Sequence, residues 1–243
     1  MRVKGKMATA FKRPDGREVE DIRPMKAKVG IVPNADGSAM FAFGGTIAIA
    51  AVYGPKELHP RNQRNPEKGT LRCTYNMNSF SVSDRIRPGP SRRSTEISKI
   101  TGWALEPVVM INNFPNTVVD VHIQIVQADA STRCAGINAA AMALAHAGIP
   151  MKDIVSSISI GKLDKQLVVD VDKAEEDWEE GEGPTDIALT FTHNDEKLSH
   201  IQLDGYISPK QLKEAVELGK QASKKVYELQ KKALKNVGEE ITG

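Results

Sequence analysis

The sequence has few residues of the kinds that mark secreted, membrane-spanning or zinc-dependent proteins. Two cysteines in 243 residues cannot build a disulfide framework, so Cys73 and Cys134 are expected to be buried thiols. The longest apolar stretches, such as IAIAAVY, are too short to cross a bilayer, and the first residues lack the apolar core of a signal peptide. The five histidines show no metal-ligand spacing. We therefore expect a protein of the cytoplasm, without zinc and without contact to a membrane.

Net charge is also small, at +2, but the charges are unevenly distributed. Between Lys56 and Arg93 there are nine lysines or arginines against three acids, a balance of +6. Between Asp170 and Asp186 there are nine acids against Lys173, a balance of −8. The basic segment suits a polyanion and the acidic segment suits a cation. Two solvated faces of opposite sign would produce the same pattern, so both interpretations stay open here.

The acidic segment is densest in AEEDWEEGEGP, residues 174–184, where six of the first nine residues are carboxylates. A solvated loop is the simpler interpretation, because runs of like charge avoid burial. A Mg²⁺ site is the alternative, since this hard cation binds through one or two carboxylates while it keeps several waters. The segment alone does not decide between them.

The order of the expected elements predicts an α+β fold. No repeat, low-complexity tract or Pro/Ser linker divides the chain, so residues 23–237 are expected to form one domain, with a flexible segment at 1–22 and a tail at 238–243. Alternating or continuous apolar patterns and turn residues predict strands, with mixed pairing, at 26–32, 39–43, 46–54, 70–77, 117–127, 156–161, 166–171, 186–193 and 198–205.

Three helices are expected to pack against these strands. Apolar residues at helical spacing predict one that opens near Ser94, and the alanine-rich residues 131–147 predict a second. The third closes the chain and is long. Ser208 is its expected N-cap, and Gln211 occupies the capping-box position.

The segment ADASTRCAG passes from a strand into a helix, where backbone N–H groups have no partner within the helix. Such a helix start can bind an anion, and here Ser131 and Thr132 add hydroxyl groups while Arg133 adds a guanidinium fork. Ordinary N-capping by Ser131 would explain the same residues without any ligand. A second segment, PSRRSTEISK, places Arg92 and Arg93 at another helix start, where guanidinium groups match phosphate geometry.

Several long motifs together resemble the RNase PH family of phosphorolytic exoribonucleases, and most closely the catalytic RNase PH-type subunit of the archaeal RNA exosome. The resemblance covers nearly the whole chain. It rests on RPDGREVEDIRP, NADGSAMFAFG, AAVYGPKELHPRN, YNMNSFSV, RPGPSRRSTEISK, QADASTRCAGINAAAMALAHAGIPM and LDGYISP. The fold that this resemblance implies is the RNase PH-type fold, a mixed sheet with packed helices and a long C-terminal helix.

The resemblance also implies where the substrates bind. Inorganic phosphate, the co-substrate, is expected at Ser131, Thr132, Arg133 and Arg93. Contacts to the RNA backbone are expected at Arg92 and at Arg61, the arginine of HPRN. Ser131 departs from the family's pattern, because the phosphate turn usually has glycine at this place.

Catalytic and metal-binding carboxylates are expected in the acidic segment, which favours the metal interpretation there. Alignment on Trp178 and Pro184 places Glu176 and Glu182 where the family has two aspartates, and Asp177 is the alternative for the first. The expected ion is Mg²⁺, or Mn²⁺ in its place. Glutamate offers the same oxygen ligands as aspartate, but its extra methylene group moves the carboxylate.

The activity implied is removal of nucleotides from RNA 3′ ends by phosphate, which releases nucleoside diphosphates, with the reverse reaction adding RNA tails. The partners implied are single-stranded RNA 3′ ends, a related inactive RNase PH-type subunit in a hexameric ring of three heterodimers, and RNA-binding cap subunits. Two alternatives stay open. One is a non-catalytic ring subunit that binds RNA, and the other is a stand-alone RNase PH that trims tRNA 3′ ends.

Overall fold

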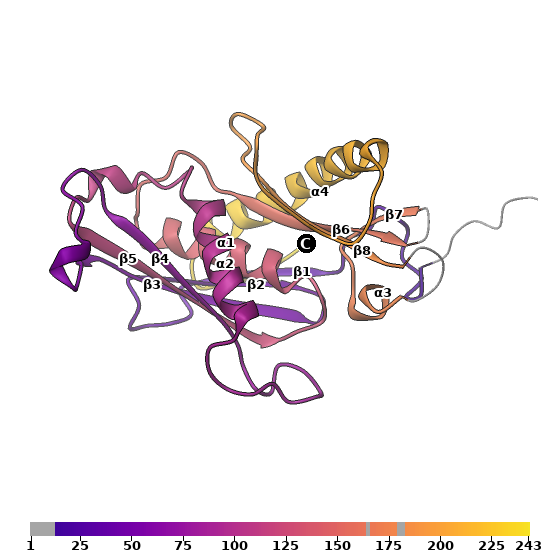
Figure 1. Ribbon diagram of the computed structural model, residues 1–243, viewed down its shortest axis with the longest axis horizontal. Helices are drawn as coiled ribbons and strands as arrows, with labels where there is room; N and C mark the ends of the chain where they lie inside the picture. Colours follow the sequence, from indigo (N-terminus) through magenta and orange to yellow (C-terminus); the bar gives the residue numbers. More distant parts are fainter. Residues whose placement is uncertain (1–12, 164–165, 179–182) are drawn as a thin grey trace, which may run out of the picture.

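The computed structural model describes residues 13–163, 166–178 and 183–243, which form two β-sheets with helices between and around them (Figure 1). The larger sheet contains, in spatial order, β10 (Glu240–Thr242), β1 (Met25–Val29), β2 (Gly37–Phe43), β3 (Thr46–Glu57), β5 (Thr117–Gln127) and β4 (Thr70–Met77). The smaller sheet contains β7 (Gln166–Val169), β6 (Ser156–Leu163), β8 (Thr185–Phe191) and β9 (Leu198–Asp204). The helices are α1 (Arg92–Leu105), α2 (Thr132–His146), α3 (Lys173–Glu176) and α4 (Pro209–Lys235), with short 3₁₀ turns at η1 (Arg61–Gln63) and η2 (Ile111–Asn113).

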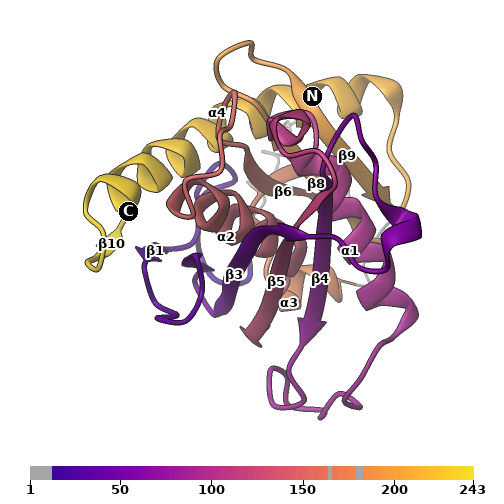
Figure 2. The same cartoon turned by 90° about the vertical axis from the view of Figure 1, so that its left-hand side faces the viewer.

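Strand pairing in the larger sheet is mixed, as the sequence predicts. β2 and β3 form an antiparallel hairpin with Phe43 opposite Thr46, and Gly44 in its turn has a φ of +50°, which glycine adopts readily. β4 pairs with β5 in parallel, and α1 is the crossover helix between these two strands. In Figure 2, β3, β5 and β4 lie side by side, with β4 at the edge of the sheet.

α2 lies between the two sheets and fills the centre of the molecule. Every residue from Cys134 to Leu144 is buried, because the helix packs on β2, β3 and β5 on one side and on β6 on the other. A helix that is apolar on all sides belongs in a core, and its many alanines let the neighbouring strands approach closely. Its one buried amide, Asn138, donates to the carbonyl of Ser157 over 2.9 Å and accepts from its N–H over 2.7 Å.

The smaller sheet packs one face against α4, which runs along β6, β7 and β8 (Figure 1). The expected cap of α4 is confirmed, since the Ser208 hydroxyl accepts from the Gln211 N–H and the Gln211 side chain accepts from the Ser208 N–H. Apolar residues of α4, including Ala215, Val226 and Leu229, are buried. In the part of the chain that the structure describes, no helix is long and apolar enough to span a membrane.

The structure differs from the sequence-based expectations near three helix or chain ends. α1 begins at Arg92, with Ser91 as N-cap, because Ser91 and Ser94 form a reciprocal capping box. Residues 238–243, expected as a tail, include β10, which pairs with β1. The expected flexible segment 1–22 lies outside the described residues up to position 12. From Arg13 onward it is held against the β7–α3 connection, where the Arg13 side chain is fully buried and bonds Glu175 over 2.7 Å.

Candidate active site

Several segments singled out in the sequence meet around the start of α2. They line a cavity of about 230 Å³ and a small second cavity beside it. Four side chains line both cavities: Arg93 from the start of α1, Arg133 from the start of α2, Glu176 from α3 and Asp186 from β8. Two arginines and two carboxylates from four elements therefore converge on one small polar space. We refer to the two cavities together as the arginine–carboxylate cavity.

One wall of this cavity is a strained turn at the start of α2. Ala130 and Ser131 both have left-handed backbones, with φ of +53° and +52°, which residues other than glycine rarely adopt. Ser131 is the N-cap residue of α2, but its side chain does not cap the helix. Simple capping by Ser131 is therefore wrong as an explanation of the STR segment, and the first backbone N–H groups of α2 receive no bond from that hydroxyl.

The two predicted phosphate-binding arginines both lie in the arginine–carboxylate cavity. Arg133 has two nitrogens, Nε and Nη1, that are buried and have no hydrogen-bond partner among the described residues. Burying an unpaired donor costs about 1–3 kcal/mol, so these nitrogens are ready for an acceptor from a ligand. Arg92 and Arg93 are both exposed at the start of α1, but only Arg93 lines the cavity.

Only one of the two neighbouring predicted carboxylates, Glu176 and Asp177, lines the cavity. Glu176 lines the cavity, whereas Asp177 has a side chain that is 63% exposed and is bound to Lys173 over 2.7 Å. One residue of helix turns the side-chain direction by about 100°, which explains why neighbours point to different places. The Lys173 ammonium group also lies 3.3 Å from a carboxylate oxygen of Glu176. Glu182 lies outside the described residues.

Asp186 is a site residue that the sequence analysis missed. In the sequence it is the last acid of the segment 170–186 and the first residue of a predicted strand, a place where a side chain reads as part of the sheet. Burial raises the pKa of Asp186 to about 6, and Glu176 and Asp204 push it the same way against the opposing effects of Arg133 and Arg93. Among the residues that the structure describes, none forms a hydrogen bond or an ion pair with the Asp186 carboxylate. The signal available in the sequence is that an acid stands at the start of the predicted strand 186–193.

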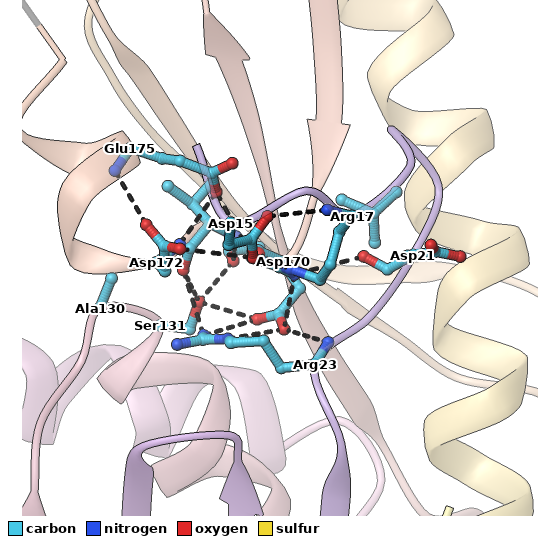
Figure 3. Close-up of polar contacts among 12 residues, drawn as sticks. Asp15, Arg17, Asp21, Arg23, Ala130, Ser131, Asp170, Asp172 and Glu175 are labelled. Carbon is cyan, nitrogen blue, oxygen red and sulfur yellow. Dashed lines mark hydrogen bonds and ion pairs between the residues drawn. The ribbon is translucent and has the colours of Figure 1, made fainter. Parts of the chain in front are cut away.

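Behind the cavity lies a dense network of paired charges, which Figure 3 shows. The Asp170 carboxylate, fully buried, accepts from Arg23 over 2.7 and 2.8 Å. Arg13 is paired with Glu175, and Arg17 contacts Asp15, Asp170, Asp172 and Glu175. The ligand oxygens of Asp15, Asp172 and Glu175 lie within 4.8 Å of one another, but these arginines already neutralise them. These paired charges therefore stabilise the fold around the site.

Arg61 lies far from this cavity, near the opposite end of β5. Its loop is joined to the start of β5 by bonds from Leu58 N–H to the carbonyl of Asn116 and from Asn116 N–H to that of Asn65. The phosphate turn instead follows the end of β5, eleven residues later, so the two places are separated by roughly 33 Å at 3.3 Å per strand residue. Arg61 is exposed and is not part of the same site.

Comparison with known families gives two matches along the chain. The 3′ exoribonuclease family RNase PH matches by its domain 1 over residues 21–150 and by its domain 2 over residues 153–222. The first range contains most of the larger sheet with α1 and α2, and the second contains the smaller sheet with α3.

Among individual proteins, the chain is 46% identical to the exosome complex component Rrp41 of Thermococcus kodakarensis over 96% of this chain and 93% of that protein. It is 44% identical to the Rrp41 of Methanopyrus kandleri over 92% of each. Among solved structures, rice Rrp46 has a TM-score of 0.81 and 29% identity over 92% of this chain and all of that one. A chain of the Archaeoglobus fulgidus exosome with RNA bound to the active site has a TM-score of 0.75 at 19% identity, over 89% of this chain and 92% of that one, which supports the fold alone.

Proposed function

The chain belongs to the RNase PH family of 3′ exoribonucleases, and on that premise we propose that it is the phosphorolytic subunit of an archaeal exosome. Its relatives are named as components of that complex. The observation that carries the proposal is the arginine–carboxylate cavity, in which Arg93 and Arg133 face Glu176 and Asp186 beside the turn at Ser131. Arginines would hold phosphate, and carboxylates would hold a cation opposite them.

The reaction proposed needs no nucleophilic side chain, because inorganic phosphate is itself the nucleophile. One of its oxygens bonds the phosphorus of the terminal nucleotide, and the bond from that phosphorus to the preceding 3′ oxygen breaks. The terminal nucleotide leaves as a diphosphate, and the freed 3′ oxygen takes a proton to become the new RNA end. The protein has to position both phosphates and to stabilise the charge between them. The same contacts serve the reverse reaction, which adds nucleotides from diphosphates.

Four groups would form the phosphate cradle. The N–H groups at the start of α2 and the Thr132 hydroxyl would donate hydrogen bonds, while Arg93 and Arg133 would add charge and paired donors. Arg133 suits this role because two of its buried nitrogens lack a partner among the described residues. Arg92 and Arg61, both exposed, would contact RNA on its way to the cavity.

A divalent cation fits the carboxylate side of this cavity, since Glu176 and Asp186 both line it and Asp186 lacks a bonded partner within the described residues. We assign the expected Mg²⁺ or Mn²⁺ to these two residues, with Glu182, which lies outside the described residues, as the further ligand predicted by sequence. The ion, when bound, supplies positive charge next to the transferring phosphoryl group.

The deciding experiment is RNA decay by the purified chain, alone and assembled with its ring partner, with and without inorganic phosphate and Mg²⁺. A 5′-labelled single-stranded RNA should shorten only when phosphate and Mg²⁺ are both present, and the products should be nucleoside diphosphates. Decay without phosphate that yields monophosphates would contradict phosphorolysis. No decay by the assembled complex would replace the proposal with a non-catalytic ring subunit, and activity confined to the isolated chain would favour a stand-alone enzyme.

A further inference from the structure

The hydroxyl group of Ser131 was expected to bind phosphate, but the structure gives it a different set of partners. Its oxygen lies 2.6 Å from the Ser159 hydroxyl, 3.0 Å from the Val171 carbonyl and 3.3 Å from a carboxylate oxygen of Asp170 (Figure 3). Ser159, Asp170 and Val171 are all buried. The Ser131 side chain is therefore directed into the protein, toward β6 and the β7–α3 connection.

These contacts close into a ring of hydrogen bonds. The Val171 N–H donates to the Ser159 hydroxyl over 3.3 Å, Ser159 can donate to Ser131, and Ser131 donates to the Val171 carbonyl. A hydroxyl group has a single proton to donate. Because the Val171 carbonyl and the Asp170 carboxylate are both acceptors for the Ser131 proton, that proton is used within the protein and none remains for a phosphate, which needs donors.

The same ring explains how a serine can occupy this backbone position. Ser131 has a φ of +52°, and the left-handed conformation costs a residue with a Cβ atom about 1–2 kcal/mol. Bonds to Ser159 and Val171 offset that cost. The turn is also held from other sides, since Thr46 donates to the Ala130 carbonyl over 2.6 Å and Arg23 donates to the Asp129 carbonyl over 2.5 Å.

We infer that Ser131 is a positioning residue: its hydroxyl ties the left-handed turn to Ser159 and Val171, and thereby aims the N–H groups of α2, Thr132 and Arg133 at phosphate. This inference rests on the proposed function, because it specifies how the proposed cradle is held in shape. It assigns direct phosphate contact to the residues after Ser131 and removes Ser131 from the ligand set.

Two substitutions at one position separate a positioning role from a ligand role. Ser131→Gly and Ser131→Ala both delete the hydroxyl, but glycine adopts a positive φ without strain and alanine does not. If Ser131 positions the turn, the glycine variant should keep the KM for phosphate within about threefold, and the alanine variant should raise it about tenfold. The kcat and the Kd for RNA should stay near the wild-type values in both variants.

The controls are matched in chemistry. Ser199→Gly and Ser199→Ala remove another part-buried hydroxyl, one that donates to the Thr190 carbonyl on β8, and should leave the KM for phosphate unchanged. Arg133→Lys loses the guanidinium fork and should raise that KM. This variant is the positive control for loss of a side chain that binds phosphate directly. Titration with inorganic phosphate alone, followed by calorimetry, gives the same ranking without turnover.

Equal losses in the glycine and alanine variants would overturn the inference in favour of a hydroxyl that binds phosphate. An alanine variant indistinguishable from wild type would overturn it as well. Hydrogen exchange in peptides that span residues 128–136 is the independent readout, and it should be faster in the alanine variant than in the glycine variant. If wild-type protein does not bind phosphate, the proposed function fails, and the exchange rates still decide whether Ser131 holds the turn.

Discussion

Asp186→Asn is expected to make the folded chain more stable while it weakens phosphorolysis. Burial raises the pKa of the Asp186 carboxyl to about 6, above the ordinary value of 3.8. In the window between these values the folded chain holds a proton that the unfolded chain has already lost, so stability falls as the pH rises through it. The difference of about two pKa units corresponds to about 3 kcal/mol, and this cost is fully present above pH 6.

The assay is thermal unfolding of wild type and Asp186→Asn between pH 4 and pH 8 in buffer with a chelator. At pH 7.5 the variant should melt about 6–12 °C higher, since 1 kcal/mol moves the melting temperature of a chain of this size by about 2–4 °C. Near pH 4 the two should agree, because the aspartic acid is then protonated in the folded wild type. Glu214→Gln, at an exposed position of α4, is the control for loss of one carboxylate and should show no such shift.

Adding Mg²⁺ extends the same experiment from stability to ligand binding. An ion that binds only the folded protein raises the melting temperature, and the rise should be larger for wild type than for Asp186→Asn. The reasoning is refuted if the two proteins have equal melting temperatures at pH 7.5 and parallel pH profiles, because the Asp186 carboxylate would then carry no cost that a ligand relieves.

Two further predictions concern the other assigned residues. Glu176→Gln and Glu182→Gln should each reduce RNA decay on the order of 10² or more, as for other removed charge stabilisers, whereas Asp177→Asn should retain most of the rate. The reverse order for positions 176 and 177 would mean that Asp177 is the ligand. Arg61→Ala should flatten the log–log salt dependence of single-strand binding by about 0.7, equally for all RNA sequences. Lys26→Ala, on β1, is its control, and a loss confined to particular sequences would contradict a backbone contact.

Local patterns in the sequence predict most of the strands and helices of the fold. The alternation in 117–127 predicts β5 with its bounds, and TLRCTYNM predicts β4 in the same way. Gly44 and Gly45 mark the β2–β3 turn, and Ser208 marks the start of α4. These features depend on residues that are close together in the chain, so the sequence alone is sufficient to predict them.

The site is less predictable because its geometry depends on distant residues. The partners of the Ser131 hydroxyl, Ser159 and Val171, are 28 and 40 positions away, so a cap and a tether cannot be told apart in the sequence. Glu176 and Asp177 are adjacent, and only the single turn of α3 separates their directions. The pKa of Asp186 depends on its burial and on the charges of Arg133, Glu176, Asp204 and Arg93, which come from other elements of the fold and cannot be read from the spacing of residues in the sequence.

Residues with strained backbones and polar groups without partners are concentrated at the arginine–carboxylate cavity. This concentration indicates that the cavity is functional. Of the five residues other than glycine with positive φ among those described, three are Ala130, Ser131 and Asp170, at or directly behind its wall. Behind the wall, buried charges are paired, as in the 2.7 Å contact between Arg23 and Asp170. Inside the cavity, Asp186 and two nitrogens of Arg133 have no bonded partner in the described part of the chain. This contrast with the paired charges behind the wall fits the proposed function, in which a phosphate and a cation would complete the unpaired groups.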